Sequence, residues 1–247
     1  MKIPTIKNII IRITAIIAVV EFAIMLGFAN LKFDIGVYTE ALLDVAILVI
    51  LSTPLIYIWI IKPYVVARDD ALHQISHMAY HDSLTQLANR RLLIEYMEKL
   101  ISGYVRGKSY GALLFIDLDG FKVINDTNGH DAGDAVLIEV AKRLNYFVRK
   151  EDIVSRVGGD EFVVVLSQLD TDEKLADNKA LMIAERILKG LNKEINYKNI
   201  SLQIGASIGL RLLAPERVSA ESALKDADTA MYSAKQAEKS HIAVHNR

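Results

Sequence analysis

The sequence predicts two N-terminal transmembrane helices followed by an α/β domain in which helices flank a central mixed sheet. The first observation behind this is a pair of long apolar runs near the N-terminus. The second is an alternation, from about residue 82 onward, between apolar residues at helical spacing and short apolar runs typical of buried strands. The third is a hydrophobic share of 52% over 247 residues, which is high for a soluble enzyme and reflects this uneven distribution.

Charge and cysteine content exclude several classes of protein. The formal net charge is -1 and 24% of the residues are charged, which fits neither a disordered chain nor a basic nucleic-acid binder. We therefore expect no DNA or RNA partner. The chain has no cysteine, so disulfides, thiolate nucleophiles, iron–sulfur clusters and cysteine zinc sites are all excluded. Any metal site must use oxygen or nitrogen ligands.

The apolar runs, residues 9–28 and 41–61, are the first two elements. At a rise of 1.5 Å per residue each run covers about 30 Å, one hydrocarbon thickness. Arg12 and Glu21 interrupt the first run, and Asp44 lies within a turn of the start of the second. Basic residues flank the outer ends of the runs more than the connecting loop, which predicts that both termini lie in the cytoplasm and that the protein spans the inner (cytoplasmic) membrane twice. These flanking residues are Lys2, Lys7, Arg12, Lys62 and Arg68.

Two questions about the first run have alternative answers. The run could be a cleaved signal peptide with Gly27-Phe28-Ala29 as its cleavage site. A signal core usually has roughly 7–15 apolar residues, so we expect this longer run to be retained. Glu21, in the middle of the run, either senses a signal or an ion, or packs as a polar residue between spans.

Residues 62–81 are expected to form a helical linker. Their apolar positions fit a short helix or a two-heptad coiled coil. These positions are Val65, Leu72, Ile75 and Ala79. His73, His77 and His81 recur every fourth residue, so on a helix they would form one stripe that could bind a metal or respond to pH. A solvated helix face is the favoured interpretation of this stripe.

The remaining residues, 82–247, alternate between helix and strand, which is typical of an α/β domain with a mixed sheet. The Gly158-Gly159 pair predicts a two-residue hairpin turn, because glycine accepts the positive φ angles that such a turn requires. In chain order we expect a helix around 93–104, a strand at 110–118, a helix from about Asp131 to Phe147, hairpin strands at 153–157 and 161–166, a helix at 172–191, strands within 200–212, a helix at 220–238 and a closing strand at 242–244.

Carboxylates lie at the ends of two predicted strands. Asp117 ends the first strand, and Asp160 and Glu161 follow the Gly158-Gly159 turn. Hard oxygen ligands hold magnesium, and a glycine turn lets a phosphate approach the backbone, so this pattern suits a divalent cation that carries phosphates. Any one of these residues alone would more simply be a turn aspartate.

Residues 158–162 read Gly-Gly-Asp-Glu-Phe, a pentapeptide expected by chance in about 10⁻⁴ of chains of this length. Three further segments lie in matching order: HDSLTQLANRR at 81–91, FIDLDGFKVINDTNGHDAGD at 115–134 and DADTAMYSAK at 226–235. In these motifs the chain resembles the GGDEF domains, which typically are diguanylate cyclases. The resemblance implies a nucleotide-cyclase-like α/β fold for residues 82–247, as a catalytic domain that follows a membrane anchor at 1–61 and the linker at 62–81.

The resemblance also implies an activity and its partners. Members of the family condense two GTP molecules into cyclic di-GMP and release two pyrophosphates, with one GTP held by each of two facing domains. The implied partners are therefore GTP as substrate, cyclic di-GMP as product and inhibitor, a second copy of the chain in a homodimer, and the membrane. The implied cofactor is Mg²⁺, or Mn²⁺ in its place.

By the same resemblance, Asp117, Asp160 and the backbone carbonyl of Leu118 ligate the metal ions. Asp160 is also the candidate that accepts the proton of the 3′-hydroxyl, and Glu161 supports the metal site. Lys122 corresponds to the lysine that contacts the phosphates and stabilises charge in the transition state. Asp160 and Lys122 are thus the expected catalytic residues, although Lys122 could instead be an ordinary surface lysine.

The resemblance implies a set of substrate-binding residues. Asn125 and Asp134 correspond to the residues that read guanine, and a carboxylate suits this because guanine N1–H and N2–H are donors where adenine N1 is an acceptor. His130 either lines the same pocket or is a helix-entry histidine held by local hydrogen bonds. Arg156 precedes the glycine turn, and Lys235 matches a basic residue that holds the terminal phosphates.

The chain departs from the family pattern after Lys235. Members usually continue toward Gly-Arg-Asn, whereas residues 238–240 read Glu-Lys-Ser. Lys239 is expected to bind substrate because it keeps the positive charge of the arginine, but it lacks the bidentate fork. We expect this change to affect the affinity for the triphosphate rather than catalysis.

Arg149 and Asp152 match the RxxD motif of the family's product-inhibition site. An arginine fork can bind a phosphate or a guanine edge, and the aspartate can accept from guanine or orient the arginine. A surface ion pair between the two residues is the alternative interpretation.

Two other functions compete with an active cyclase. The first is a catalytically inactive GGDEF module that binds cyclic di-GMP or GTP and signals to a partner. Inactive copies usually lose one of four residues that this chain retains, namely Asp117, Lys122, Asp160 and Glu161. The second is a small transporter or channel, which two spans per chain cannot enclose unless several chains assemble. An active, membrane-anchored diguanylate cyclase is the favoured prediction.

Overall fold

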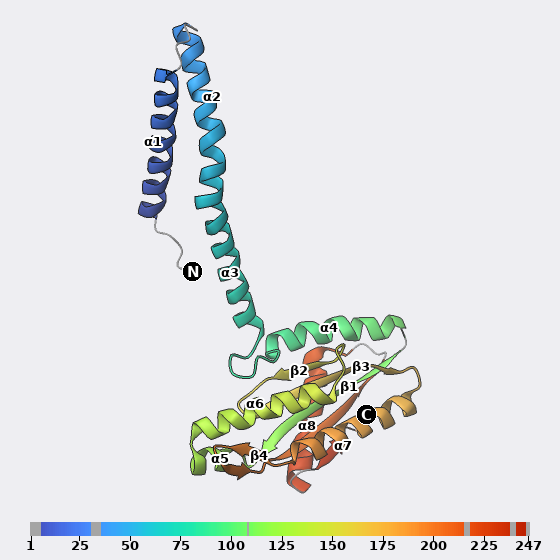
Figure 1. The fold of residues 1–247 in the computed structure, drawn as a ribbon. Helices are drawn as coiled ribbons and strands as arrows, with labels where there is room; N and C mark the ends of the chain where they lie inside the picture. The colour runs from blue at the N-terminus through green and yellow to red at the C-terminus, as the bar shows by residue number, and fades with distance from the viewer. Residues whose placement is uncertain (1–5, 31–35, 108, 215–217, 238–240, 246–247) are drawn as a thin grey trace. The chain divides into compact units, whose positions relative to one another are not determined.

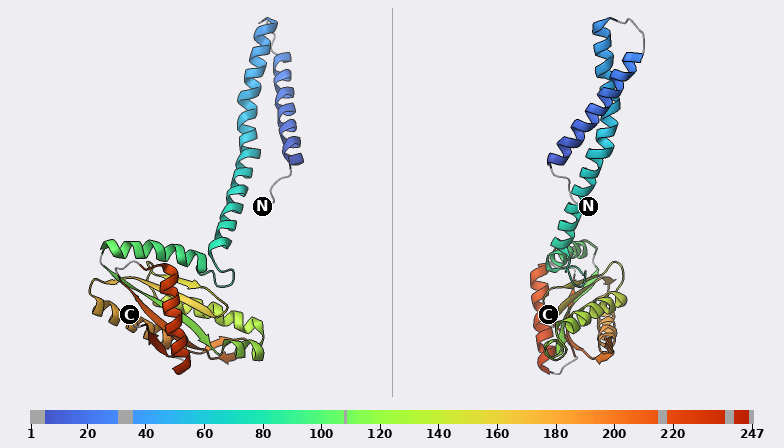
Figure 2. Two further views of the ribbon diagram at one scale, coloured as in Figure 1. Left: turned by 180° about the vertical axis from the view of Figure 1, so that it is seen from behind. Right: turned by 60° about the vertical axis from the view of Figure 1, so that its left-hand side comes forward.

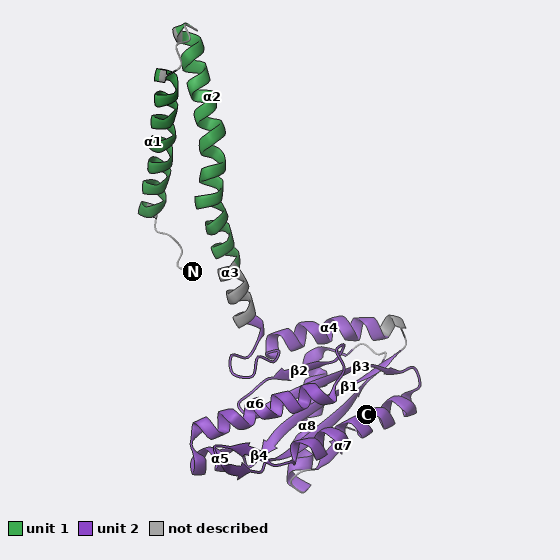
Figure 3. Ribbon diagram, in the orientation of Figure 1, with its two compact units in different colours: residues 1–77 green, residues 78–247 purple. Residues whose placement is uncertain are grey.

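The computed structural model describes residues 6–30, 36–107, 109–214, 218–237 and 241–245, with the side chains of residues 6, 30, 37, 70–78 and 105–107 outside this description. The chain divides into two compact units, residues 1–77 and 78–247 (Figure 3). The helices and strands of both units are labelled in Figure 1 and seen from two further sides in Figure 2.

Unit 1 is helical. Its elements are α1 Ile6–Asn30, α2 Val37–Ile56, the π-helix η1 Tyr57–Ile61 and α3 Lys62–Tyr80, whose last turn enters unit 2. Two stretches, residues 7–29 and 38–69, are long and apolar enough to cross a bilayer, and they include the two predicted spans. Length and composition indicate a membrane anchor only weakly, because a signal sequence near the N-terminus shares them.

The linker is helical, as predicted, because α3 covers residues 62–80. Helices α2, η1 and α3 follow one another without a break. The prediction that three histidines share one helical stripe is wrong for His81. Helix α3 ends at Tyr80, and His81 lies in a β-bridge with Ala88, with its Nδ1 3.2 Å from the carbonyl oxygen of Gln86. The side chains of His73 and His77 lie outside the described residues.

Glu21 lines a cavity between α1 and α2. The cavity has a volume of about 580 Å³, and Glu40 and Asp44 of α2 also line it. Met25 and Phe28 supply part of its apolar wall. Both interpretations of Glu21, as a sensor of a signal or ion and as a packing residue, are compatible with this position.

A five-stranded sheet in the order β2-β3-β1-β6-β7 forms the centre of unit 2. Its neighbours are antiparallel except for β6 and β7, which are parallel, so the sheet is mixed as predicted. The strands of this sheet are β1 Tyr110–Asp119, β2 Ile153–Arg156, β3 Glu161–Asp170, β6 Gly205–Leu213 and β7 Ile242–Val244. The helices are α4 Arg90–Gly107, α5 Phe121–Asn128, α6 His130–Phe147, α7 Glu173–Leu191 and α8 Ala220–Ala237. A separate hairpin consists of β4 Ile195–Tyr197 and β5 Ile200–Leu202.

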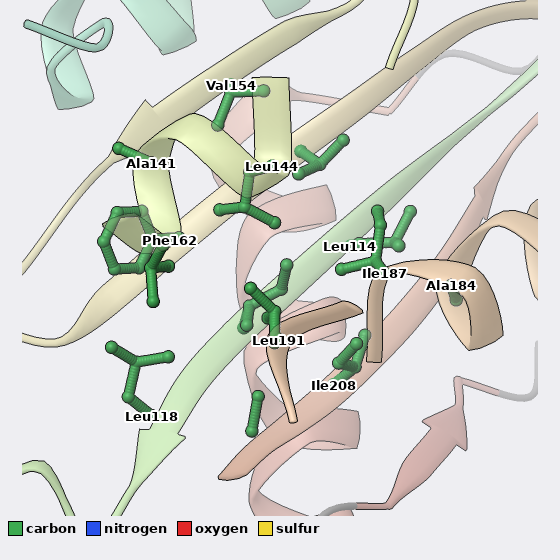
Figure 4. Packing of buried hydrophobic residues seen from close by; sticks show 14 of the residues in the cluster. Leu114, Leu118, Ala141, Leu144, Val154, Phe162, Ala184, Ile187, Leu191 and Ile208 are labelled. Carbon is green, nitrogen blue, oxygen red and sulfur yellow. The ribbon is translucent and has the colours of Figure 1, made fainter. Parts of the chain in front are cut away.

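Helices cover both faces of the sheet. Side chains of α6 and α7 form one core with the sheet, and side chains of α4 and α8 form the other. Alternation along β1 divides its residues between them, because Leu114 and Leu118 belong to the first core (Figure 4) and Leu113 and Phe115 to the second. The odd-numbered residues of β1, which include Asp117, therefore point toward α4 and α8.

The structure differs from the predictions in the short elements. Helix α5 and strand β4 were not predicted, because segments of this length show too little periodicity. Helix α5 is bounded by Gly120 and Gly129, which have positive φ angles of 82° and 84°. The predicted positive-φ turn is wrong, since neither Gly158 nor Gly159 has a positive φ. The connection is also longer than two residues, because β2 ends at Arg156 and β3 begins at Glu161.

Candidate active site

Asp117 lies near the end of β1 on the side of the sheet that α8 covers. The residue is only 7% exposed, and its Oδ1 accepts a hydrogen bond from Lys235 Nζ at 2.7 Å. Burial raises the pKa of Asp117, Lys235 counteracts this rise, and the charges of Asp160 and Asp119 add to it. The hydrogen bond to Asp117 raises the pKa of Lys235 in turn. An ammonium group from α8 is thus held against a buried carboxylate at the strand end.

Glu161 faces Asp117 directly across the β1–β3 pair. Burial raises the pKa of Glu161, and the charges of Asp117, Asp228 and Asp160 raise it further. Gly158 makes room for this side chain, because a Cβ at position 158 would lie 2.3 Å from Oε2 of Glu161. Glycine at this position thus allows the close approach of a carboxylate rather than a positive φ.

Asp160 lies in the connection directly before β3. Its backbone carbonyl accepts a hydrogen bond from the backbone N–H of Leu118 at 3.2 Å, which ties the connection to the end of β1. The four predicted metal ligands are therefore brought to one end of the sheet. Carboxylates that raise one another's pKa favour a cation between them, and hard oxygen donors fit Mg²⁺ or Mn²⁺. Among the described residues no group of three or more carboxylates or histidines lies close enough together to form a metal site.

Lys122 lies in the first turn of α5 and is exposed. Gly120, with its left-handed φ of 82°, turns the chain from β1 into this helix. Ser207 fixes the end of β1 from the neighbouring strand by donating a hydrogen bond to Asp119 Oδ1 at 2.9 Å. Within the described part of the chain the Lys122 side chain has no ion pair or hydrogen bond, which leaves its ammonium group available to an anion.

The predicted guanine readers lie on α5 and α6. Asn125 is half-buried on α5, whereas His130 and Asp134 are exposed on α6. The two helices meet at Gly129, whose backbone N–H donates to the carbonyl of Asn125 at 2.9 Å. The carboxamide of Asn125 lies directly against Gly133, the neighbour of Asp134. The fold therefore gathers the candidate base-reading side chains at one corner, between α5 and α6.

Arg156 directs its guanidinium group to other parts of the protein. Its Nε and Nη2 donate to the carbonyl of Gly159 at 3.2 and 2.7 Å, and its Nη1 donates to Asp82 Oδ1 at 3.1 Å. Burial on its own raises the pKa of Asp82, but hydrogen bonds from Thr85 and Arg156 outweigh it and lower the pKa. Arg156 thus ties the connection before Asp160 to the segment that enters the domain. Its contact with substrate stays a prediction.

The Arg149–Asp152 segment lies at the opposite end of β2 from the glycine connection. Four residues of strand separate the two, which corresponds to about 13 Å. The two carboxylate oxygens of Asp152 accept hydrogen bonds from the backbone N–H groups of Arg149 and Ser167, both at 2.8 Å. Among the described residues there is no ion pair between the side chains of Arg149 and Asp152.

Some neighbours of the site were not predicted from the sequence. Asp228 acts on Glu161 electrostatically, and both residues line a cavity of about 570 Å³ together with Arg90. Asp228 and Lys235 are seven residues apart, which is two helical turns, so they lie on one face of α8. This spacing could have revealed Asp228 from the sequence.

Lys239, which was predicted to bind substrate, lies outside the described residues.

Comparison with known proteins shows to which family the chain belongs. Residues 79–241 match the family model described as diguanylate cyclase, GGDEF domain. The chain belongs to the GGDEF family. The bifunctional diguanylate cyclase/cyclic di-GMP phosphodiesterase MucR of Pseudomonas aeruginosa is 38% identical over 165 residues, which are 67% of this chain and 23% of MucR. The diguanylate cyclase DgcP of Escherichia coli is 41% identical over 159 residues, 64% of this chain and 45% of DgcP. The chain thus spans less than half the length of these two relatives.

Solved GGDEF structures confirm the predicted fold. The GGDEF domain of TpbB from Pseudomonas aeruginosa is similar at a TM-score of 0.63 and 36% identity, covering 68% of this chain and 95% of that one. The GGDEF domain of DgcB from Caulobacter crescentus, solved in complex with c-di-GMP, is similar at a TM-score of 0.61 and 26% identity, covering 68% and 94%. A mixed sheet flanked by helices is therefore the architecture of this GGDEF domain.

Replacing Arg156 of this GGDEF domain should lower its stability. We expect Arg156→Lys to reduce the free energy of unfolding by about 1–2 kcal/mol, because lysine keeps the charge but cannot bridge Asp82 and the carbonyl of Gly159. Chemical denaturation of residues 78–247 measures this loss. Since the fold lowers the pKa of Asp82, the part due to the ion pair is present at neutral pH and disappears as the pH falls through that lowered pKa.

A matched control for this change is Arg91→Lys. Arg91 is 66% exposed, and its Nε lies 3.5 Å from Glu95. An exposed pair of this kind contributes about 0–1 kcal/mol, so the control should change the stability little. Equal losses in the two variants would contradict a bridging role for Arg156.

Proposed function

We propose that this chain is a diguanylate cyclase that condenses two GTP molecules into cyclic di-GMP and releases two pyrophosphates. The observation that carries this proposal is the meeting of Asp117, Glu161 and Lys235 at one end of the sheet. Carboxylates there suit a metal ion, and the lysine beside them suits the phosphates that the metal carries. The descriptions of MucR and DgcP as diguanylate cyclases support the same chemistry.

The roles that we propose for the individual residues are those that the family resemblance implies. The ligands of Mg²⁺ or Mn²⁺ would be Asp117, Asp160, Glu161 and the carbonyl of Leu118. When bound, the metal supplies positive charge to the phosphate oxygens on which negative charge develops. Asp160 would accept the proton of the attacking 3′-hydroxyl. Lys122 and Lys235 would neutralise phosphate charge from two sides of the site, and Lys239 would add to this beyond the end of α8.

Recognition of guanine would take place at the corner between α5 and α6. The carboxylate of Asp134 can accept from guanine N1–H and N2–H, whereas adenine offers an acceptor at N1 and leaves the carboxylate unpaired. Asn125 would complete the hydrogen bonds along the base edge, and His130 would line the same pocket. Such a site prefers GTP over ATP.

The active species would be a homodimer at the inner membrane, because each domain holds only one of the two reacting nucleotides. The apolar helices α1 and α2 support an anchor formed by residues 1–61, and the basic residues that flank them support a cytoplasmic catalytic domain. In this organisation residues 62–81 link the anchor to a catalytic domain at 82–247.

Incubation of the purified full-length protein with GTP and Mg²⁺, followed by chromatography of the products, tests the proposal. We expect cyclic di-GMP and pyrophosphate to form, and ATP in place of GTP to give no cyclic dinucleotide. Tight binding of GTP without turnover would identify an inactive module instead. If the protein neither binds nor converts GTP, the proposal is wrong.

Product inhibition should depend on Arg149, which lies away from the carboxylates that would hold metal and GTP. Loss of a charge-assisted contact typically costs about 1.5–3 kcal/mol, so Arg149→Ala should raise the inhibition constant of cyclic di-GMP about tenfold or more. Initial rates without added product should stay at the wild-type value. Titration of cyclic di-GMP into assays of both proteins measures the effect.

The neighbouring exposed residue Lys150 offers a matched control, since Lys150→Ala removes the same charge one position along the chain. Asp152→Ala is a poorer probe, because Asp152 also holds the backbone of Ser167 on β3. Identical inhibition curves for wild type and Arg149→Ala would show that the RxxD segment takes no part in inhibition.

A further inference from the structure

Gly133 is buried in α6 directly against Asn125 of α5. A Cβ at position 133 would lie 1.9 Å from Oδ1 of Asn125, 2.9 Å from its Cγ and 3.2 Å from Cζ of Phe121. Real Cβ atoms essentially never come within 3.0 Å of a heavy atom outside their own and adjacent residues. The Asn125 carboxamide therefore occupies the space that any side chain at position 133 would need.

The Asn125 carboxamide lies against the backbone of Gly133. Although the residue is half-buried, its side chain makes no hydrogen bond with any other described residue. A carboxamide has two N–H donors and two acceptor lone pairs, so this one keeps its full hydrogen-bonding capacity for a ligand. Asp134, the residue after Gly133, is exposed at the same corner of the two helices.

We propose that Gly133 is a positioning residue that sets nucleotide specificity: by having no side chain, it lets the Asn125 carboxamide lie beside Asp134, where both can meet the edge of guanine. The inference rests on the proposed function, which places GTP in this site. A side chain at position 133 would force the 1.9 Å approach out to at least 3.0 Å, so Asn125 would move by about 1 Å. A hydrogen bond to a base edge weakens steeply over such a shift.

The effect should therefore appear in discrimination between bases. A site that hydrogen-bonds its correct substrate rejects the wrong one through those bonds, so their loss weakens GTP binding and leaves ATP binding little changed. We expect Gly133→Ala in the full-length protein to raise the Kd of a non-reacting GTP analogue about tenfold or more. The Kd of the matching ATP analogue should change less than about twofold. The preference for GTP over ATP should therefore fall by nearly the same factor as the rise in the Kd of the GTP analogue.

A double-mutant cycle separates positioning from simple packing. In an Asn125→Ala background, adding Gly133→Ala should change the Kd for the GTP analogue less than about twofold, because the side chain that Gly133 positions is absent. The double variant should also regain the melting temperature that Gly133→Ala loses, because the new methyl group then fills vacated space. If Gly133→Ala alone does not fold, a failure of Asn125→Ala to restore folding would overturn the contact on which the role of Gly133 rests.

Two other glycines provide matched controls. At Gly190 on α7 a Cβ would lie 2.1 Å from the ring of Phe147, so Gly190→Ala introduces a similar overlap. Phe147 is the last residue of α6, about 20 Å along that helix from Gly133. It should lower the melting temperature without changing the ratio of GTP to ATP affinity. At Gly103 a Cβ would meet nothing within 4 Å, so Gly103→Ala should neither lower the melting temperature nor change the ratio of GTP to ATP affinity.

The outcomes distinguish this inference from the proposed function. If the wild-type protein has no preference for GTP, the proposed function fails. If the wild type prefers GTP and Gly133→Ala keeps that preference, the role of Gly133 alone is wrong. Equal effects of Gly133→Ala with and without the Asn125 side chain, or a double variant that stays as unstable as Gly133→Ala, would overturn it as well.

Discussion

Asp117→Asn is expected to lower the rate of cyclic di-GMP formation by a factor of about 10³ or more. The change keeps the shape of the side chain but removes the charge that would hold the metal ion, and it also removes the ion pair that holds Lys235 Nζ 2.7 Å from Oδ1. Both the proposed metal site and the lysine proposed to bind phosphate are therefore affected at once. Chromatography of the products over a time course of GTP conversion measures the loss.

The same variant should remain folded. Burial raises the pKa of Asp117, which means that the folded state disfavours its charge, so a neutral amide removes an unfavourable term. Lys235 is 44% exposed and can be hydrated when its partner is lost. Asp170→Asn is the matched control, because Asp170 pairs with Lys179 at 2.6 Å at the far end of β3. Full activity in Asp117→Asn, or an equal loss in Asp170→Asn, would contradict the assignment.

The positions of the candidate carboxylates in the fold could be predicted from the sequence, but their mutual contacts could not. The Gly-Gly-Asp-Glu-Phe motif and the apolar strand before Asp117 placed the carboxylates at strand ends. Strand β1 is buried on both faces, so its sequence shows no alternation of apolar and polar residues to reveal which face Asp117 occupies. Its hydrogen bond to Lys235 joins residues 118 positions apart and depends on the packing of α8.

One local prediction failed because tertiary contacts determined the structure. Gly158 looked like a turn glycine, yet its φ is not positive and the carboxylate of Glu161 occupies the space beside it. The contacts of Arg156 within the protein could not be predicted either, and its role in substrate binding stays a prediction. Its guanidinium reaches Asp82, 74 positions earlier, and no pattern within a single segment predicts such a distant partner. Local patterns thus predicted the elements better than the roles of the charged side chains between them.

The catalytic unit alone, residues 78–247, is expected to lose specific activity on dilution, because each domain would hold only one of the two reacting nucleotides. This unit has its own cores, and the GGDEF domain of TpbB has been solved by itself, so it should fold without the anchor. Below the dimer dissociation constant the fraction of dimer is proportional to total protein, so a tenfold dilution should lower the specific activity about tenfold. Rates measured over a dilution series test this dependence.

Fusion of a dimeric coiled coil to the start of this unit should restore activity at low concentration, because tethering raises the effective concentration of the second domain to about the millimolar range. A coiled coil with charged residues at its seam positions is the matched control, since it adds the same mass without pairing. An excess of the Asp117→Asn unit should inhibit the wild-type unit, because each mixed dimer then contains one incomplete nucleotide site. A dilute unit with constant specific activity that resists this inhibition would mean that a single domain brings both nucleotides together.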